Sequence, residues 1–175
     1  RCEWLYYDDG TMVSAMGAGG AIYWAIMLPA NSLSAYAGTN LTQVAVMEYN
    51  TAGSYTANIY LGGDSAPGTL VSTQNFSCTG TQDWKYVTLD TPVAIDGTQN
   101  LWITMYQSGI TYPATACTNT GDPNGRWVSV DGNEWIDITT AGAFNYTWMI
   151  RGYVTNQAKG GSLDRKSGSA GMPRP

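Results

Sequence analysis

Short runs of alternating apolar and polar residues, each ended by turn-forming residues, recur along most of this chain. Alternation with a period of two is typical of a strand that is buried on one face. No stretch longer than a turn or two shows the apolar spacing of an amphipathic helix. The separators, such as Gly62-Gly63-Asp64 and Asp131-Gly132-Asn133, have the composition of turns. The chain is therefore predicted to be all-β.

About ten strands are expected, which fits a two-sheet antiparallel β-sandwich, jelly-roll-like in type. They span Glu3–Tyr7, Ala21–Leu28, Leu41–Tyr49, Tyr55–Leu61, Thr69–Asn75, Lys85–Leu89, Gln99–Tyr106, Arg126–Val130, Glu134–Ile138 and Tyr146–Val154. The clearest hairpin runs from Arg126 to Ile138 around an Asp-Gly turn. Trp127 and Val128 point to opposite faces there, and the sequence leaves open which face is buried.

The alternating pattern stops after Thr155. Residues 156–175 are rich in Gly, Ser and Pro and have almost no large apolar side chains, which is the composition of a linker. We therefore expect one β-sandwich domain over residues 1–155, followed by a linker or tail over residues 156–175.

Charged residues make up 12% of the chain, about half of the roughly 25% found in average soluble domains. Residues 1–155 carry a net charge of −8 and residues 156–175 a net charge of +3. Nucleic acid is an unfavourable partner for such an acidic body. No apolar run approaches the ~20 residues of a membrane-spanning helix. A surface of uncharged polar residues is common outside the cell.

Nineteen residues are Trp or Tyr, and none is His. Flat amphipathic rings favour a binding surface, and the lack of His removes the usual general base near neutral pH. The chain is therefore predicted to be a non-enzymatic module that binds a glycan or a protein. The expected ligand-binding residues are Trp127, Arg126, Trp135, Asn124 and Tyr112. Exposure is also expected for Tyr36 and Trp84, and burial for Trp24, Trp102 and Trp148.

Two other functions stay open. The protein could be a structural subunit of a surface fibre or assembly, with its tail docking on a neighbouring subunit. It could also be a glycosidase, which needs two carboxylates roughly 5 to 10 Å apart and no His. The candidate carboxylates for that reaction are Glu48, Asp131, Glu134 and Asp137.

No cofactor is required by any motif, and calcium is the one metal that the sequence suggests. Asp8 and Asp9 precede Gly10, and Asp122 and Asn124 share a loop. These are the oxygen ligands that calcium prefers, although Asp and Asn are also ordinary turn formers.

Cys2, Cys78 and Cys117 match no zinc-ligand spacing. Cys78 and Cys117 both lie in stretches rich in Thr and Asn, which predicts a disulfide between them with Cys2 left over. Three free thiols are the equal alternative.

Several segments together resemble the β-sandwich modules of large secreted surface proteins of Bacteroidota, of the kind associated with gingipains and haemagglutinin-type adhesins. They are Trp4–Gly10, Ala66–Val71, Thr91–Ile95, Gln99–Ile103, Asp131–Trp135 and Tyr146–Arg151. The resemblance covers residues 1–155. It implies that the protein is secreted or attached to the cell surface, beside neighbouring domains or subunits of a larger surface protein. Asp64-Ser65-Ala66 is also similar to the short O-glycosylation signal of Bacteroidota, which makes Ser65 a candidate acceptor.

Overall fold

Residues 2–156 are described in the computed structural model, so the expected linker or tail at 156–175 lies outside the described residues except for Asn156. Thirteen strands form the fold: β1 (Glu3–Tyr6), β2 (Ser14–Met16), β3 (Ile22–Leu28), β4 (Asn40–Met47), β5 (Gly53–Leu61), β6 (Thr69–Cys78), β7 (Trp84–Ala94), β8 (Leu101–Gln107), β9 (Ala114–Thr118), β10 (Trp127–Ser129), β11 (Ile136–Asp137), β12 (Tyr146–Trp148) and β13 (Ile150–Thr155). The helical segments are single turns: α1 (Ala30–Leu33), η1 (Ser34–Tyr36), η2 (Pro123–Gly125) and η3 (Ile138–Thr140).

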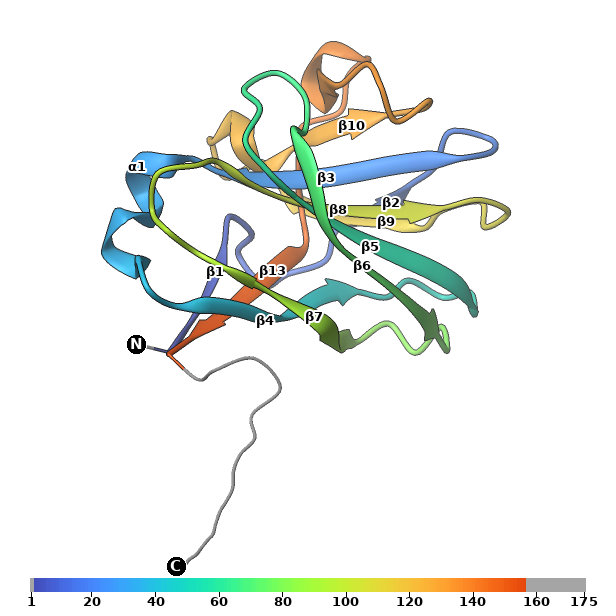
Figure 1. The fold of residues 1–175 in the computed structure, drawn as a ribbon. Helices are drawn as coiled ribbons and strands as arrows, with labels where there is room; N and C mark the ends of the chain where they lie inside the picture. Colours follow the sequence, from blue (N-terminus) through green and yellow to red (C-terminus); the bar gives the residue numbers. More distant parts are fainter. Residues whose placement is uncertain (1, 157–175) are drawn as a thin grey trace, which may run out of the picture.

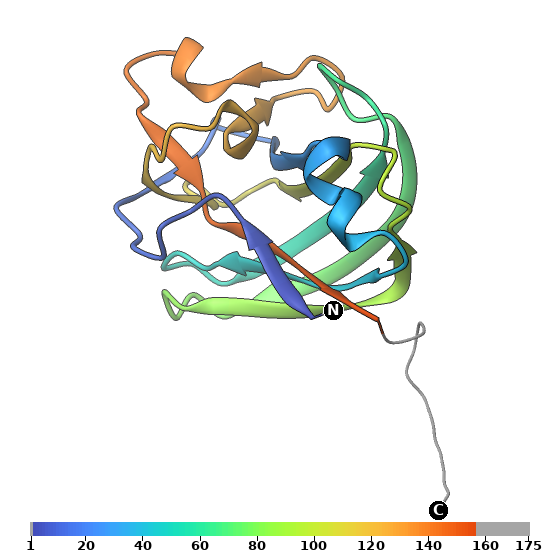
Figure 2. The same cartoon turned by 90° about the vertical axis from the view of Figure 1, so that its left-hand side faces the viewer.

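The strands form two packed layers (Figures 1 and 2). One layer is a six-stranded sheet in the order β11-β10-β3-β8-β5-β6. The other joins a four-stranded sheet, β1-β13-β4-β7, to a three-stranded sheet, β12-β9-β2. These two small sheets meet at Met149, whose N–H donates to the Thr115 carbonyl and whose carbonyl accepts from the Met47 N–H. Every strand pair is antiparallel.

Successive strands usually lie in different layers. The chain crosses from β3 to β4, returns to β5 and β6, and crosses again to β7 and back to β8. This alternation between layers is the connectivity of jelly-roll sandwiches. The predicted all-β sandwich is therefore confirmed, with thirteen strands in place of about ten.

Alternate residues of the strands fill the space between the layers. On β3 the inward side chains include Trp24 and Ile26, and both are completely buried. The layers leave no room for a side chain at Gly152 of β13, where a Cβ would lie 2.6 Å from Ile103 Cδ1 and 2.9 Å from Leu41 Cδ1. Each fully buried large apolar side chain contributes about 1.5–3 kcal/mol, so this interior is the main source of stability.

Two strands escaped prediction from the sequence. The segment of β9, Ala-Thr-Ala-Cys-Thr, has small residues that resemble a polar loop, yet four of its five residues are buried. β2 has only three residues. Both belong to the three-stranded sheet, which also takes β12 from the first half of the expected strand over residues 146–154.

The predicted hairpin is confirmed as β10 and β11, with Trp127 opposite Asp137 and Val128 opposite Ile136. Val128 faces the core and Trp127 lies half-buried on the opposite face. None of the helical turns within residues 2–156 has the length and apolar character needed to cross a membrane.

Candidate binding face

The outer face of the six-stranded sheet gathers aromatic and polar side chains that the strand alternation turns away from the core. On β3, burial of Trp24 between the layers leaves Tyr23 on the outer side. On β8, burial of Ile103 and Met105 leaves Tyr106 outward in the same way. We call this surface the binding face. Its members are Tyr23, Tyr60, Tyr106, Trp127, Thr56, Asn58, Thr73 and Asn75.

One continuous row of side chains crosses four strands of the binding face. Tyr23 on β3 stands opposite Tyr106 on β8, Tyr106 stands opposite Thr56 on β5, and Thr56 stands opposite Asn75 on β6. The rings of Tyr23 and Tyr106 lie 4.7 Å apart between centroids. The row therefore passes directly from paired rings to hydroxyl and amide groups.

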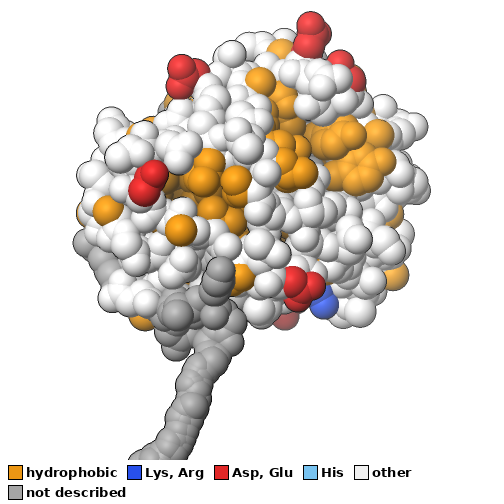
Figure 3. All heavy atoms as spheres, viewed as in Figure 1, with side chains coloured by type: hydrophobic (Ala, Val, Ile, Leu, Met, Phe, Trp, Pro, Cys, Tyr) orange, Lys and Arg blue, Asp and Glu red, His pale blue; other side chains and the backbone are white. Residues whose placement is uncertain are grey.

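Hydrophobic side chains gather beside β3 on this side of the molecule, below acidic side chains at the upper edge (Figure 3). Trp102 lies beneath the surface, fully buried, with ring centroids 4.9 Å from Trp127 and 5.8 Å from Trp135. The Trp102 Nε1 donates to the Gly63 carbonyl at 2.9 Å. Trp102 is thus buried as expected, but it belongs to a second apolar cluster outside the sandwich interior.

Two tryptophans of the hairpin are held by their own N–H groups. Trp127 Nε1 donates to Asn124 Oδ1 at 3.2 Å, and Trp135 Nε1 donates to the Gly132 carbonyl at 3.2 Å. Trp135 is only 9% exposed, so the expectation that it lies open to solvent is wrong. It packs over Trp102 and against Tyr23. Trp127 is half-buried and stays available at the edge of the binding face.

The polar half of the binding face leaves amide donors free. Thr56 Oγ1 donates to Asn75 Oδ1 at 2.8 Å, and Thr73 Oγ1 donates to Asn58 Oδ1 at 3.0 Å. These bonds fix the amide oxygens toward the threonines. No described residue accepts a hydrogen bond from either Nδ2 group, so both amide N–H pairs are available to a ligand.

A shallow hollow of about 530 Å³ extends from this row toward the ends of the strands. Tyr106, Thr56 and Asn75 line it together with three serines. The serines are Ser54, Ser77 and Ser108. The hollow is therefore rich in hydroxyl and amide groups beside aromatic rings, since Tyr55 and Phe76 line it as well as Tyr106.

Two phenols of the binding face, those of Tyr23 and Tyr60, stay neutral near physiological pH. Burial raises the pKa of Tyr23, and the neighbouring Tyr106 and Asp131 raise it further. Burial likewise raises the pKa of Tyr60, with a smaller effect from Tyr23. Each hydroxyl can therefore donate or accept a hydrogen bond.

Arg126, the expected ligand-binding cation, is bound within the protein. Its Nε donates to both carboxylate oxygens of Asp137, at 2.9 and 3.0 Å, and its Nη1 donates to Asn119 Oδ1 at 2.9 Å. These bonds join Arg126 to strand β11 and to the segment after β9, so Arg126 positions the hairpin that carries Trp127.

The remaining aromatic residues predicted to be exposed lie away from the binding face. Tyr112 is 53% exposed between β8 and β9, and no ring of residues 2–156 stacks on it. Tyr36 is buried, against expectation, and its hydroxyl donates to Glu3 Oε2 at 2.7 Å. Trp84 lies in the other layer, where the Arg151 guanidinium sits 4.2 Å from its ring centroid. The structure thus brings Asn124, Trp127 and Trp135 together, and it places Tyr112 apart from them.

The expected calcium ligands make turn and ion-pair contacts. Arg151 donates to both oxygens of the buried Asp8 carboxylate, at 2.6 and 3.1 Å. Asp9 Oδ1 accepts from the Thr11 N–H, and Asp122 Oδ1 accepts from the Asn124 N–H, each at 2.9 Å. Within residues 2–156, no three His, Cys, Asp or Glu side chains come together as a metal-binding group.

The carboxylates considered for glycoside hydrolysis fall in three separate places. Glu48 is buried, and its Oε1 accepts from the N–H groups of Thr79 and Gly80 at 2.8 and 2.7 Å. Asp137 is held by Arg126. Asp131 and Glu134 are three residues apart in one hairpin turn, where the Asp131 carboxylate accepts from the Glu134 N–H.

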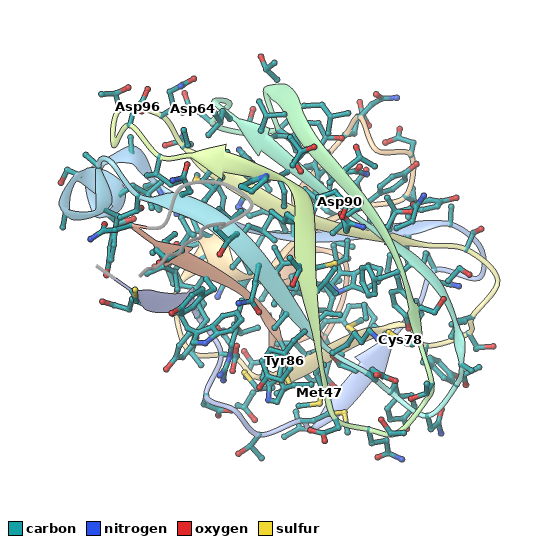
Figure 4. The ribbon with its side chains drawn as sticks, turned by 60° about the horizontal axis from the view of Figure 1, so that its bottom comes forward. Met47, Asp64, Cys78, Tyr86, Asp90 and Asp96 are labelled. Carbon is teal, nitrogen blue, oxygen red and sulfur yellow. The ribbon has the colours of Figure 1, made fainter. Side chains whose placement is uncertain are left out.

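The predicted disulfide between Cys78 and Cys117 is wrong, since all three cysteines are free. Cys78 ends β6 and faces the main core (Figure 4), whereas Cys117 lies on β9 and packs with Met47 and Met149. Burial raises the pKa of Cys78 to about 12 and that of Cys117 to about 11. The stretch around Cys117 was expected to be a loop, and its place in a strand accounts for the error.

Ser65, the candidate glycosylation acceptor, is exposed in the turn between β5 and β6. Its neighbour Asp64 accepts a hydrogen bond from Asn100 Nδ2 at 3.0 Å. The turn therefore presents the serine on a fixed backbone.

The sequence did not single out Tyr23, Tyr106, Asn58 or Asn75. The signal that could have found them is the position of each residue within an expected strand, because side chains next to core-facing positions point outward. It also missed a second aromatic group, on the outer side of the four-stranded sheet. That group consists of Trp4, Tyr6, Trp84, Tyr86 and Tyr153 around Arg151. Tyr86, labelled in Figure 4, is 58% exposed.

No protein-family model matches the chain, and no curated protein matches its sequence. The function must therefore be argued from the geometry of the binding face.

Proposed function

We propose that the protein is a non-enzymatic module that binds a neutral glycan chain on the binding face. One observation carries the proposal: the row in which the paired rings of Tyr23 and Tyr106 continue into the hydroxyl and amide groups of Thr56 and Asn75. A sugar presents apolar C–H groups on its ring faces and hydroxyl groups around its edge. The row offers a matching partner to each.

The length of the row favours an oligosaccharide over a monosaccharide. It crosses four neighbouring strands, which are spaced roughly 4.8 Å apart, so its ends lie roughly 14 Å from each other. Sheet strands also hold side chains more rigidly than loops do, which lowers the entropy lost when a ligand is bound. A rigid row of this length suits several consecutive sugar units.

The charges near the row favour a neutral glycan over an acidic one. Of the cations in the described chain, Arg126 is paired with Asp137 and Arg151 with Asp8. Lys85 lies on β7 of the other layer. No described cation is therefore placed to bind a carboxylate or sulfate group on the binding face, and Asp131 beside Tyr23 would repel one.

The proposal assigns no catalytic step to the binding face. Glycoside cleavage needs two carboxylates on opposite sides of the bond, and Asp131 and Glu134 share one turn. We also propose that the protein acts outside the cell, where its few charges and many hydroxyl and amide groups are typical, and where glycans are accessible.

Affinity electrophoresis in gels that contain single neutral polysaccharides tests the proposal. At least one polysaccharide should retard the wild-type protein, and Tyr23→Ala with Tyr106→Ala should abolish the retardation. Binding that survives the double change would place the glycan elsewhere. The glycan assignment would be overturned if no polysaccharide retarded the protein and the same tyrosines bound a protein partner instead.

A further inference from the structure

A separate cavity of about 300 Å³ lies beneath the β10–β11 hairpin, on the side away from Tyr23. Its walls come from the end of β2, the start of β3, the hairpin and the segment after η3. The apolar wall residues include Met16, Ile22, Val128, Ile138 and Phe144. A volume of this size is at the lower end of the range for small-molecule sites, roughly 300–1,000 Å³.

Backbone packing fixes one wall of the cavity. Gly17 follows β2 so closely against the β8–β9 loop that a side chain would place its Cβ 1.8 Å from the Thr111 carbonyl oxygen. Only glycine fits at this position. The opposite wall is the short pairing of Val128 with Ile136. The hollow is therefore formed by paired strands and a fixed turn.

The mouth of the cavity is acidic. Asp131 and Glu134 both line it. Asp131 Oδ1 accepts from Ser129 Oγ at 3.0 Å and from the N–H groups of Asn133 and Glu134 at 2.8 and 2.9 Å. These donors lower the pKa of Asp131, the backbone N–H groups of Glu134 and Asn133 most strongly. Its Oδ2 makes no hydrogen bond within the described chain, and neither does the Glu134 side chain.

No cation of residues 2–156 lines the cavity to balance these carboxylates. Arg126 and Arg151 are engaged with Asp137 and Asp8. The cavity therefore has an apolar interior and a negatively charged mouth without a neighbouring cation. These features favour a ligand with an apolar body and a positive charge at its exposed end.

We propose that this cavity binds a small organic amine, with its hydrocarbon part against Met16 and Ile22 and its ammonium group between Asp131 and Glu134. The apolar contacts supply most of the affinity, because the carboxylates lie at a solvated mouth where an ion pair adds about 0.2–1 kcal/mol. The carboxylates supply the preference for a cation. This site is distinct from the glycan proposal, because no member of the binding face lines the cavity, although Asp131 at the mouth also lies near Tyr23.

Three probes of similar shape separate the contributions: phenethylamine, 2-phenylethanol and phenylacetate. Binding is followed by the methyl resonance of Met16 in NMR titrations of the protein. Phenethylamine should bind about 1.4- to fivefold more tightly than 2-phenylethanol, and phenylacetate should bind most weakly. Equal affinity for the amine and the alcohol, or no binding by the amine, would overturn the proposal.

Variants locate the site. Asp131→Asn with Glu134→Gln retains the turn acceptors and should bring the amine affinity down to that of the alcohol. Ala141→Trp should block both ligands by filling the mouth, whereas Ala94→Trp, at an exposed position of β7 in the other layer, should leave them bound. Amine binding that persists in Ala141→Trp would show that the cavity is not the site. Thermal unfolding of each variant shows whether it is folded.

Discussion

Tyr106 lies between Tyr23 and Thr56 in the register of the six-stranded sheet, with its ring 4.7 Å from that of Tyr23. It is thus the residue at which the aromatic half of the binding face meets the polar half. A ring pair of this kind contributes about 0.5–1.5 kcal/mol beyond its buried area. Changes at Tyr106 should therefore alter ligand binding strongly and stability only slightly.

Two buried tryptophans provide a matched test of hydrogen bonding in the core. Trp148 Nε1 donates to the Trp127 carbonyl at 2.7 Å, whereas Trp24 Nε1 has no hydrogen-bond partner in the described chain. Both side chains are fully buried. Substitution by Phe removes similar volume at each position, but only Trp148→Phe also removes a hydrogen bond. Trp148→Phe should destabilise the protein by about 2 kcal/mol more than Trp24→Phe, measured by urea unfolding.

An equal decrease in the free energy of unfolding in the two variants, or a larger decrease in Trp24→Phe, would contradict the assignment of the hydrogen bonds. The m-values of the two urea unfolding curves should agree, because both variants expose nearly the same surface when they unfold.

The ion pair between Asp8 and Arg151 should contribute to stability more than an ordinary surface pair. Asp8 has a fully buried side chain, and the Arg151 guanidinium lies 4.1 and 4.2 Å from the ring centroids of Tyr6 and Trp84. Asp8→Ala leaves the arginine without its counter-ion and should cost about 2–3 kcal/mol. Asp9→Ala, at the exposed neighbouring position, should change the free energy of unfolding by about 0.5 kcal/mol.

Chemical denaturation of the two alanine variants measures this difference. If Asp8→Ala lowered the free energy of unfolding by less than Asp9→Ala does, Asp8 would not be paired with Arg151 in solution.

The three thiols should differ sharply in reactivity. Cys2 is exposed, and hydrogen bonds from the Thr155 and Tyr153 side chains lower its pKa. Cys78 and Cys117 are buried, and burial raises the pKa of each thiol. The folded protein should therefore react with Ellman's reagent at one thiol, and the unfolded protein at three. Only one reactive thiol after unfolding without reductant would indicate the disulfide that the structure lacks.

Acid should loosen the turn around Asp131. Hydrogen bonds from the Glu134 and Asn133 N–H groups and from Ser129 lower the pKa of Asp131 from 3.8. A carboxyl group with a lowered folded pKa stabilises the fold above its unfolded pKa, and that stabilisation is lost as pH falls through the folded value. NMR titration of the Asp131 carboxyl carbon should give a pKa below 3.8 in the folded protein. Ser129→Ala should raise it, and a wild-type pKa above 3.8 would contradict the turn geometry.

Local patterning in the sequence predicted much of the sandwich. The runs that became β3 and β8 are rich in strong β-formers, and the run that became β5 also alternates clearly. The Asp-Gly turn placed β10 beside β11. The strands of the three-stranded sheet were missed because β2 is short and β9 is made of small residues. Those strands are stabilised by contacts with distant segments, such as Thr147 opposite Cys117, which local patterns do not contain.

The candidate site was predictable only in part. The sequence favoured Trp127 and Asn124, which the structure joins by a hydrogen bond. It did not favour Tyr23 and Tyr106, because their pairing depends on strands 83 residues apart in the chain. The sequence also favoured Arg126 as a ligand-binding residue. In the structure its guanidinium binds the carboxylate of Asp137, which comes from another strand.

Isothermal titration with a retarding polysaccharide tests the central claim, the location of the glycan on the binding face. Tyr106→Ala should weaken binding at least about fivefold, because stacking on an aromatic side chain gains roughly 1–3 kcal/mol for nucleic-acid bases and a similar gain is expected for the C–H face of a sugar. Tyr106→Phe should keep most of the affinity, and Tyr112→Ala, which removes a more exposed tyrosine elsewhere, should bind as the wild type does. An unchanged affinity in Tyr106→Ala, or an equal loss in Tyr112→Ala, would contradict the account.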